Sequence, residues 1–462
     1  MKMWSGRFRQ ALDPEFERWQ RSFEFDRRLL NYELAASAAH AKALKTAGVL
    51  SADELISILE GLQQIGAMNL PQDDEAEDVH HFVEKQLVAR IGELGYKLHS
   101  GRSRNEQIAT DLKMFVRTAI DQLRADLAEV CAAFVDRAEQ AGSASMPAYT
   151  HLQHAEPVLV GHWLLAYVEM FLRDAERLAD CRKRVNVCPL GSGAVAGATL
   201  AIDRASMAKE LDFDVPTANS IDATSDRDFA IELVNALSLL GLHLSRWAEE
   251  MVLFSSQEFG FVQLPESYST GSSAMPQKKN PDLLELIRSK SGRIIGCATA
   301  LMITMKGLPL AYNKDLQEMQ QPLFDAANSV MGMLPLIAGF VKAVEFDYPC
   351  MDEASKSGFM NAWAAATYLV KRGVPSRLAH ELIGKAVKLC VEKNCELHDL
   401  ALGELHALNP AFDDNFYECL KPASVLAIHD MPGGTAPARV RQGIAAARKK
   451  IEALREQAHA HA

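Results

Sequence analysis

The chain has 462 residues, of which 48% are hydrophobic and 24% charged, with 27 glycines and 18 prolines. This composition is typical of a folded globular protein and excludes a disordered one. The formal net charge of −11 argues against nucleic-acid binding, because neutralising phosphates requires a basic face. A small anionic ligand needs only a local basic pocket, so that class of ligand stays open.

The sequence also argues against a membrane or secreted protein. Its longest apolar stretches, Ile294 to Met305 and Val330 to Val341, fall well short of the roughly 20 residues that a membrane helix needs. The N-terminal sequence M-K-M-W-S-G-R-F-R-Q lacks the apolar run of a signal peptide, which predicts a cytoplasmic location. The eight cysteines contain no C-x-x-C pair and therefore predict neither disulfides nor zinc.

Residues 1–105 show short helical patterns, such as D-V-H-H-F-V-E-K-Q-L-V, and predict a mixed helical N-terminal domain. The segment ends in S-G-R-S-R-N-E-Q, where Ser103 and Glu106 fit the S-x-x-E capping box of a following helix. Capping does not require Arg102, Arg104 or Asn105. Guanidinium groups beside a helix N-terminus suit a carboxylate or phosphate, so this segment is also a candidate anion site.

A central domain, residues 106–355, carries unusually long helical periodicity. A thirty-residue helix is about 45 Å long, so helices of this length usually align in a bundle. The fold prediction is therefore all-α, with three domains and a central bundle of five long helices. The five predicted helices are about 107–140, 157–185, 226–256, 281–306 and 316–344.

The second of these helices begins P-V-L-V-G-H-W-L-L-A-Y-V-E-M-F-L and is apolar nearly all round. Such a helix should be buried on every side, which predicts that several chains associate as a homo-oligomer. Before it stands Y-T-H-L-Q-H-A-E-P, in which His151 and His154 lack the other ligands of a metal motif. A hydrogen-bonding or acid/base histidine is the favoured interpretation, and a purely structural histidine stays open.

Two further loops precede the third long helix. P-L-G-S-G-A-V-A-G, residues 189–197, has glycines but follows the charged end of a helix instead of a strand, so it fails the test for a dinucleotide-binding loop. N-S-I-D-A-T-S-D-R-D, residues 219–228, places Arg227 in a first helical turn, where a structural helix favours acids. A cation there indicates an anionic ligand.

The loop T-G-S-S-A-M-P-Q-K-K-N-P-D, residues 270–282, precedes the fourth long helix. Asn280, Pro281, Asp282 and Glu285 make a well-formed helix start, with an N-cap, a proline at N1 and acids in the first turn. Capping leaves six polar or small residues of the loop unexplained and indicates that the loop has a chemical role. These residues are Gly271, Ser272, Ser273, Gln277, Lys278 and Lys279.

The last region, residues 356–462, has shorter helical patterns interrupted by G-V-P-S, L-N-P and M-P-G-G-T-A-P. It predicts a third, small helical domain. No strand alternation and no internal repeat is evident along the sequence, so we expect no sheet.

Several of these segments resemble the argininosuccinate lyase family of the fumarase/aspartase superfamily. The resemblance covers nearly the whole chain and rests on segments that occur in the family's order. They are S-G-R-S-R-N-E-Q-I-A-T-D-L, Y-T-H-L-Q, P-L-G-S-G-A-V-A-G, D-A-T-S-D-R-D-F, G-S-S-A-M-P-Q-K-K-N-P-D, Y-N-K-D-L-Q-E and G-K-A-V. The resemblance implies a homotetramer of three-domain helical subunits, with active sites shared between subunits.

The reaction that the resemblance implies is elimination of arginine from argininosuccinate to leave fumarate, with no metal or organic cofactor. The family's base is the first serine of G-S-S, here Ser272, with Ser273 as the competing choice. A developing carbanion needs oriented cations and donors, which Lys278 and Asn280 would supply. The family's candidate acid is His151, held by Glu285, since the guanidine must leave protonated.

The sequence therefore predicts catalytic roles for Ser272, His151, Lys278 and Glu285. The predicted substrate contacts are Ser22, Arg102, Ser103, Asn105, Thr150, Arg227, Asn280, Tyr312, Gln317 and Gln320. The chain departs from the family at one point. Met319 and Gln320 replace the usual Asp-Lys, whose lysine contacts substrate, and losing that cation would cost about 1 to 3 kcal/mol.

Three alternatives stay open. Gln320 allows a lyase that acts on another N-substituted aspartate, unless a second cation such as Lys314 compensates. A non-catalytic relative of the crystallin kind is disfavoured, because the candidate catalytic residues are all present. A helical scaffold without a ligand is the interpretation that composition alone would allow.

Overall fold

The computed structural model describes residues 10–459, which form nineteen α-helices, five short 3-10 helices and eight short strands. The prediction of an all-α fold is confirmed. The chain divides into two compact units. The first unit comprises 1–122, 177–238 and 292–330, and the second comprises 123–176, 239–291 and 331–462. The three-domain division proposed from the sequence stays a prediction.

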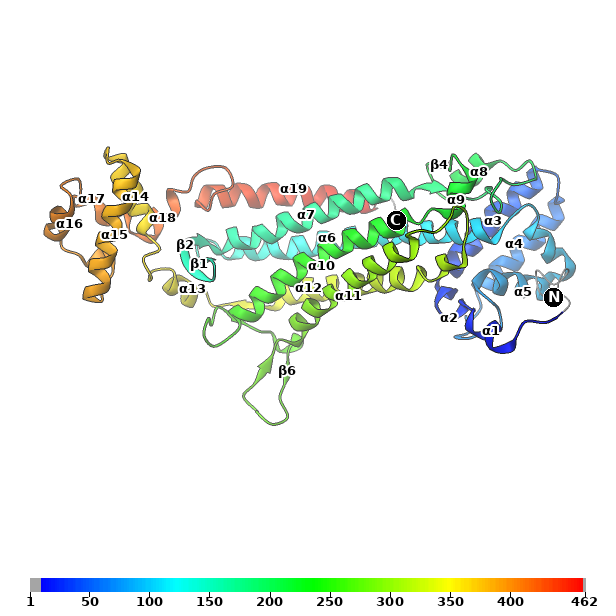
Figure 1. The fold of residues 1–462 in the computed structure, drawn as a ribbon, viewed down its shortest axis with the longest axis horizontal. Helices are drawn as coiled ribbons and strands as arrows, with labels where there is room; N and C mark the ends of the chain where they lie inside the picture. Colours follow the sequence, from blue (N-terminus) through cyan, green and yellow to red (C-terminus); the bar gives the residue numbers. More distant parts are fainter. Residues whose placement is uncertain (1–9, 460–462) are drawn as a thin grey trace. The chain divides into compact units, whose positions relative to one another are not determined.

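The five predicted long helices are all present (Figure 1). Their ends differ from the predicted ones by a few residues, because 3-10 and strand segments take up some flanking positions. In particular, residues Lys314–Gln317 form the 3-10 helix η4 ahead of the fifth long helix. The five helices are α6 (Arg104–Gln140), α7 (Val160–Val185), α10 (Asp228–Phe254), α11 (Asp282–Met305) and α12 (Gln320–Ala343).

The first unit also contains the short helices of the N-terminal region and of the segment between α7 and α10. The helices are α1 (Pro14–Trp19), α2 (Phe23–Asp26), α3 (Leu30–Thr46), α4 (Ala52–Gly66), α5 (Val79–Ile91), α8 (Arg204–Glu210) and α9 (Ser220–Ser225), with η1 (Arg27–Leu29) and η2 (Gly92–His99). Buried residues of α3, α6 and α8 form one of its cores, together with Cys188 and Phe213.

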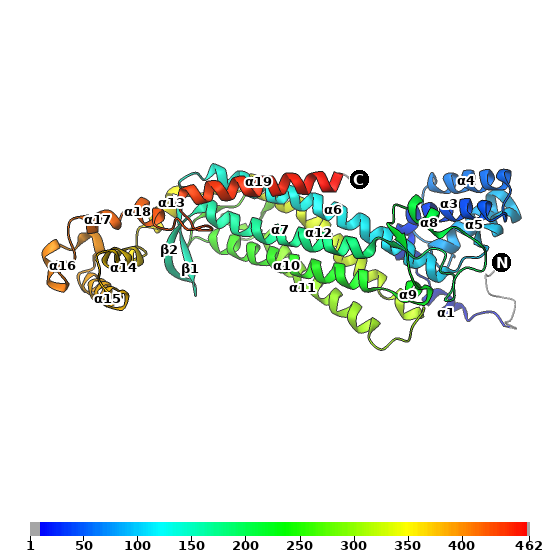
Figure 2. The ribbon, with the colours of Figure 1, turned by 90° about the horizontal axis from the view of Figure 1, so that it is seen from above.

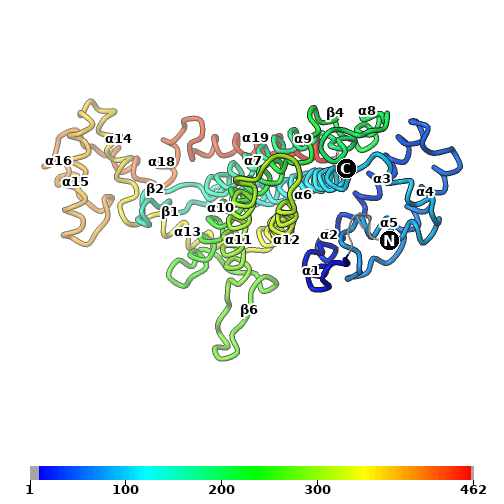
Figure 3. The backbone as a smooth tube through the Cα atoms, turned by 45° about the vertical axis from the view of Figure 1, so that its right-hand side comes forward, coloured from blue at the N-terminus to red at the C-terminus, as the bar shows by residue number. Residues whose placement is uncertain are grey.

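The second unit contains a compact group of short helices near the C-terminus, which Figure 3 shows as a cluster of turns. Its core includes Leu369, Leu382, Phe412 and Phe416. Besides the long helices, this unit contains α13 (Tyr348–Ala354), α14 (Ala362–Lys371), α15 (Ser376–Lys393), α16 (Leu402–Leu408), α17 (Asn415–Cys419), α18 (Pro422–Ala427) and α19 (Pro437–His459), with η3 (Glu266–Tyr268) and η5 (Leu397–Asp399).

Helix α19 returns beside α6 and α7 in the second unit (Figure 2). Charged pairs hold it there: Arg448 Nη2 lies 2.9 Å from Asp136 on α6, and Lys450 Nζ lies 3.5 Å from Glu169 on α7. Exposed ion pairs of this kind contribute little free energy each, so the buried apolar residues of α19, such as Val440 and Ile451, provide most of its docking.

The expectation that the chain has no strands was wrong. Strands β1 (Ser145–Thr150) and β2 (Gln153–Leu159) form an antiparallel hairpin directly before α7. Pro147 pairs with Pro157, and the register shifts between Pro147 and Tyr149, so prolines and a bulge mask the alternation that marks a strand. The other pairs have two residues a strand: β3 (Val187–Cys188) with β4 (Val215–Pro216), β5 (Val262–Gln263) with β8 (Glu345–Phe346), and β6 (Thr270–Gly271) with β7 (Lys279–Asn280).

The expectation that the second long helix is buried on every side depends on association with other chains and stays a prediction. Helix α7 exposes a stripe that includes Glu169, Arg173 and Glu176, spaced three and four residues apart on one face. Its apolar run covers only the first half of the helix. Large exposed apolar side chains lie instead on three other long helices: Leu239 and Leu242 of α10, Leu286, Ile295, Met302 and Ile303 of α11, and Leu336 of α12.

Two helical segments are long and apolar enough to span a membrane when judged by length and composition alone. They are Asp228–Phe254 and Lys314–Ala343, and 50% and 56% of their apolar windows are buried within the chain. A core helix of a globular protein passes the same test, so these segments are weak evidence for a membrane protein.

Candidate active site

The loop between β6 and β7 carries the candidate base and stands out from the helices around it (Figure 1). Asn280 Nδ2 donates to Gly271 O at 3.3 Å, which closes the base of the loop across the two strands. Helix α11 begins at Asp282, with acids in its first turn as predicted, and Glu285 N donates to Pro281 O at 3.1 Å. This bond makes Pro281 the N-cap, one residue after the predicted Asn280, which lies in β7. The β6–β7 pair therefore connects the loop to the N-terminus of a long helix.

The Ser272 hydroxyl is held by two backbone donors within this loop. Its Oγ accepts from Ala274 N at 3.3 Å and from Met275 N at 3.1 Å. Hydrogen bonds to a developing anion favour it, so this turn stabilises the deprotonated form of Ser272. Among residues 10–459, no comparable pair of backbone donors reaches the Ser273 hydroxyl, and this difference favours Ser272 as the base.

The two lysines of the loop have different surroundings. Lys279 Nζ donates to Leu264 O at 3.1 Å and so anchors the loop. Lys278 is exposed, and within the described chain its ammonium group has no ion-pair partner. A cation that no protein carboxylate neutralises is available to an anionic substrate.

His151 lies at the tip of the β1–β2 hairpin, flanked by the paired residues Thr150 and Gln153. The tip is a two-residue turn in which both φ angles are positive, 57° at His151 and 59° at Leu152. Turns of this kind match the twist of a hairpin but favour glycine and asparagine. The hairpin therefore holds the exposed imidazole at its tip, and the turn residues have a strained backbone conformation.

Leu152 is the more strained of the two residues, because a left-handed conformation costs a large side chain about 1 kcal/mol. Its side chain is also 72% exposed and so gains little from packing. Replacing Leu152→Asn is expected to raise the melting temperature of the protein by a few degrees. The control is Leu310→Asn, another exposed leucine, 75% exposed, that lies outside the positive-φ positions. An unchanged or lower melting temperature for the first variant would contradict the strain argument.

Glu285, the predicted partner of His151, does not contact it within the second unit. The Glu285 carboxylate is half exposed and lies 3.8 Å from Arg288 of the same helix. Neither a hydrogen bond nor an ion pair joins it to His151 in the described residues of the chain. The predicted His151–Glu285 pair therefore stays a prediction.

In the first unit, Glu106 joins two of the predicted loops. The Ser103 N–H donates to Glu106 Oε1 at 3.1 Å, which is the reciprocal bond of the predicted capping box. Glu106 Oε2 accepts from Gly193 N at 2.9 Å, and Asn105 Nδ2 donates to Ala194 O at 3.1 Å. Burial raises the pKa of Glu106, because its charge is removed from water. The start of α6 and the 189–197 loop thus lie against each other.

Arg227 is the most direct sign of an anion site in the first unit. Its side chain is fully buried, and its Nη1 donates to Asp226 O at 2.7 Å. Its Nε and Nη2 atoms have no hydrogen-bond partner among the described residues. Burial lowers the pKa of Arg227, and burial also raises the pKa of Tyr312 to about 12, with Arg227 acting in the opposite direction on that phenol. A buried guanidinium with two unused donor atoms is built for an anionic partner.

Ser22 and Gln317 are both buried and already bonded to protein atoms. Ser22 Oγ donates to Asp26 Oδ2 at 2.6 Å, and Gln317 Nε2 donates to Gln20 O at 3.1 Å. Lys314 Nζ lies 2.9 Å from Glu77 Oε1. Lys314 is therefore already neutralised by a carboxylate, which weakens the idea that it replaces the missing lysine at position 320.

Gln320 is buried, and its Oε1 accepts no hydrogen bond from the described residues. The neighbouring Met319 is buried as well. A buried amide oxygen without a donor costs free energy, so this position is expected to meet a donor when substrate is bound. The nearby Lys314 is paired with Glu77, so it does not offer a free charge in place of the family's lysine.

The sequence prediction missed a buried polar cluster behind the α6 N-terminus. Glu33, His80 and Asp111 are buried with ligand-type atoms within 4.8 Å of one another, a spacing that would allow a metal ion. Both Glu33 oxygens, however, already accept hydrogen bonds from protein donors. We therefore describe the cluster as a hydrogen-bond network. The available signal was the polar series Glu33, Ser37 and His40, spaced four and three residues apart on one face of α3.

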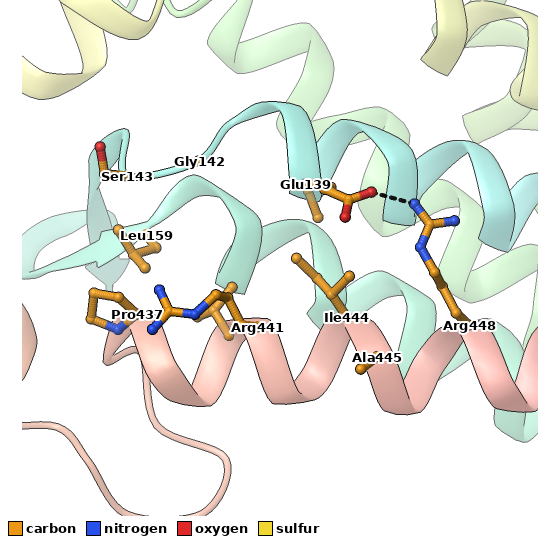
Figure 4. A pocket seen from close by; sticks show the side chains of 11 residues that line it. Glu139, Gly142, Ser143, Leu159, Pro437, Arg441, Ile444, Ala445 and Arg448 are labelled. Atoms are coloured by element: carbon orange, nitrogen blue, oxygen red, sulfur yellow. Dashed lines mark hydrogen bonds and ion pairs between the residues drawn. The ribbon is translucent and has the colours of Figure 1, made fainter.

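Two cavities lie elsewhere in the second unit. One, of about 550 Å³, separates the end of α6 from α19 and is lined by Leu159, Ile444 and Arg441 (Figure 4). Another, of about 870 Å³, borders the β1–β2 hairpin and includes Leu152 and His154. Neither contains any of the four predicted catalytic side chains.

Comparisons with known proteins identify the family of the chain. A family model described as "Lyase" matches residues 6–296, and one described as "Argininosuccinate lyase C-terminal" matches residues 359–427. The chain is 60% identical to the argininosuccinate lyase of Koribacter versatilis, over 100% of both chains. It is 57% identical to that of Acidobacterium capsulatum, over 97% of this chain and 95% of the relative.

Solved structures of related enzymes share the fold. EDDS lyase in complex with formate has a TM-score of 0.85 at 24% identity, covering 98% of this chain and 93% of its own. The 3-carboxy-cis,cis-muconate lactonizing enzyme from Pseudomonas putida has a TM-score of 0.74 at 21% identity, covering 95% of this chain and 100% of its own. With the two family models and the full-length relatives, these matches show that the chain belongs to the argininosuccinate lyase family of the fumarase/aspartase superfamily.

Proposed function

We propose that the protein catalyses the reversible elimination of argininosuccinate to L-arginine and fumarate. The observation that carries the proposal is the Ser272 hydroxyl, whose oxygen accepts two backbone hydrogen bonds in a loop with a free lysine. Full-length relatives at 46 to 60% identity are argininosuccinate lyases, which supports the same reaction. The reaction belongs to arginine biosynthesis, and no cofactor enters it.

In the proposed mechanism, Ser272 removes the proton from the carbon beside a substrate carboxylate. Negative charge then builds on that carboxylate, and Lys278, Asn280 and the N-terminus of α11 stabilise it. A serine is a weak base in water, so closure of the loop over the substrate is needed to exclude water and to strengthen the two backbone hydrogen bonds.

The carbon–nitrogen bond breaks as the guanidine leaves. An arginine guanidinium holds its proton with a pKa above about 12, so an acid must protonate the leaving nitrogen. His151 takes this role on its exposed turn, and Glu285 orients the imidazole and stabilises its charged form. The remaining contacts are proposed for Ser22, Arg102, Ser103, Asn105, Thr150, Arg227, Asn280, Tyr312, Gln317 and Gln320.

We further propose that the protein is a cytoplasmic homotetramer of three-domain subunits, whose active sites combine residues of different subunits. Two observations support this assembly. His151 and Glu285 do not contact each other within the described chain, so the proposed pair would join two subunits, and α10, α11 and α12 expose apolar side chains. Exposed apolar stripes on long helices are typical of helices that pack in a shared core.

The assembly leads to a test on α11. Ile303 is 66% exposed there, and replacing Ile303→Glu is expected to convert the tetramer to smaller species and to lower fumarate release at least 10-fold. Sedimentation velocity and a fumarate assay would measure both. The control is Ile56→Glu on α4, because Ile56 is 54% exposed outside the long helices. A tetramer unchanged by the first substitution would contradict the proposed interface.

A second candidate is a lyase that acts on a different N-substituted aspartate. Gln320 supports it, because its uncharged, unpaired amide replaces a lysine that contacts substrate. The experiment compares fumarate release, followed by ultraviolet absorbance, from argininosuccinate, adenylosuccinate, aspartate and other N-succinyl amines. Turnover of argininosuccinate above the others supports the first proposal, and turnover of another compound alone supports the second. Release from none of them would favour a non-catalytic, crystallin-like relative.

A further inference from the structure

A buried anion lies behind the loop that carries Ser103 and Asn105. Glu33 of α3 is buried, and its Oε1 accepts from Ser37 Oγ at 2.6 Å and from Gln107 Nε2 at 3.2 Å. Its Oε2 lies 2.8 Å from His80 Nδ1. Burial alone would raise the pKa of Glu33, but His80 and Arg102 bring it down to about 2. Glu33 is therefore ionised at neutral pH, deep inside the first unit.

Arg102 is the cation that this anion holds. Its side chain is 4% exposed, its Nη1 donates to Ser37 Oγ at 2.9 Å, and its Nη2 lies 3.8 Å from Glu33 Oε1. The Ser37 hydroxyl therefore works as a relay, because it accepts from Arg102 while donating to Glu33. The guanidinium has only donors, so the Ser37 hydrogen points to Glu33, and the charge of Glu33 strengthens both this bond and the attraction for Arg102.

Asp111 makes Glu33 the anion of the cluster. It lies farther along α6 than Gln107, and its Oδ2 is 3.6 Å from His80 Nδ1. Both carboxylate oxygens are buried without a hydrogen-bond partner in the described chain. Burial, and next to it the charge of Glu33, raise the pKa of Asp111 well above its usual range. This shift favours the protonated form of Asp111, and Glu33 is the carboxylate of the cluster that lies against Arg102.

Arg102 stands directly before the N-cap of α6. Ser103 follows it, and Asn105 lies in the first turn. Fixing Arg102 fixes the path of the chain into that turn, because its guanidinium is held against Ser37 and Glu33. Gln107 ties the same turn to Glu33 from the other side.

We propose that Glu33 is a positioning residue for the lyase reaction: through Ser37, Arg102 and Gln107 it holds the first turn of α6, so that Ser103 and Asn105 face the substrate. This inference rests on the proposed function, because it assigns Ser103 and Asn105 to the substrate. Glu33 itself touches no substrate atom. Its loss should therefore affect binding more than the chemical step.

The test uses the full-length protein with Glu33→Gln, which keeps the shape of the side chain and removes the charge. The KM for argininosuccinate is expected to rise at least 10-fold, while kcat stays within about 3-fold. Ser37→Ala, which removes only the relay, should raise KM by a smaller factor. The matched control is Glu54→Gln on α4, whose carboxylate makes an exposed ion pair with Lys97, and its KM should not change.

A double-mutant cycle separates positioning from general stability. If Glu33 acts through Arg102, the KM of the Glu33→Gln, Arg102→Lys double variant equals that of the worse single variant. The proposal would be overturned if the effects of the two single substitutions on KM multiplied in the double variant, or if kcat fell while KM stayed unchanged. If Glu33→Gln does not fold, the same cycle with Ser37→Ala decides.

The dissociation constant of fumarate, measured by calorimetry on the same variants, keeps this result separate from the proposed function. It should weaken at least 10-fold in Glu33→Gln even if the true amine product is not arginine. If the wild type does not cleave argininosuccinate but Glu33→Gln still weakens fumarate binding, the proposed substrate is refuted and the positioning role of Glu33 is supported. Unchanged fumarate affinity would refute the positioning, whichever substrate is cleaved.

Discussion

Replacing Ser272→Ala is expected to lower kcat for fumarate release by about 10²- to 10⁴-fold, the usual contribution of a general base. The KM should change only a few-fold, because the loop keeps its other contacts. The Oγ atom that is removed accepts two backbone hydrogen bonds and has no buried polar partner to leave unsatisfied, so the variant should fold normally. Steady-state kinetics with argininosuccinate, after circular dichroism to confirm folding, would measure the effect.

Ser273→Ala is the matched control, because it deletes the same atom one position along the same exposed loop. Its kcat should fall by less than about 10-fold. If the two variants exchange these results, Ser273 is the base and the two backbone donors on Ser272 have another role. If neither variant loses activity, serine is not the base, and the proposed mechanism is wrong.

Replacing Arg227→Met is expected to raise KM by about 100-fold or more while raising the melting temperature of the ligand-free protein. The two donors that lack partners would each contribute about 1.5 to 3 kcal/mol once they bind a carboxylate. Without ligand, the same buried cation is desolvated with few partners. An apolar side chain of similar length therefore removes an unfavourable group from the fold. The substitution is therefore expected to weaken substrate binding while it stabilises the ligand-free fold.

Fumarate provides a second measurement at this site. It should raise the melting temperature of the wild type in proportion to its occupancy, and it should not do so for Arg227→Met. Arg184→Met is the control, since Arg184 forms an exposed pair with Glu232 in the same unit and should affect neither quantity. A destabilised Arg227→Met protein with normal KM would show that Arg227 has a structural role only.

The long helices and the polar loops could be predicted because each depends on local sequence. Apolar residues spaced three or four apart over many turns specify a helix wherever its apolar face is later buried. The start of α11 was predicted to within one residue, because Pro281 and the acids Asp282 and Glu285 mark the beginning of a helix by local sequence alone.

The features that sequence reasoning missed depend on distant contacts. Glu33 and Asp111 read as ordinary polar positions on helices, and only the fold brings His80 between them. The β1–β2 hairpin was missed because its prolines and bulge hide the alternation. The complete burial of α7 stays a prediction, because periodicity alone does not say how many neighbours a helix has.

Glu106 limits how the protein can change over evolution. In an ordinary helix the residue at this position of a capping box is exchangeable, and its loss costs a modest amount of helix stability. Here one carboxylate both closes the start of α6 and holds Gly193. A substitution that weakens the cap therefore also releases the neighbouring loop. A replacement of Glu106 therefore changes both the stability of α6 and the position of the 189–197 loop. We expect a second substitution in that loop to accompany any replacement that is retained.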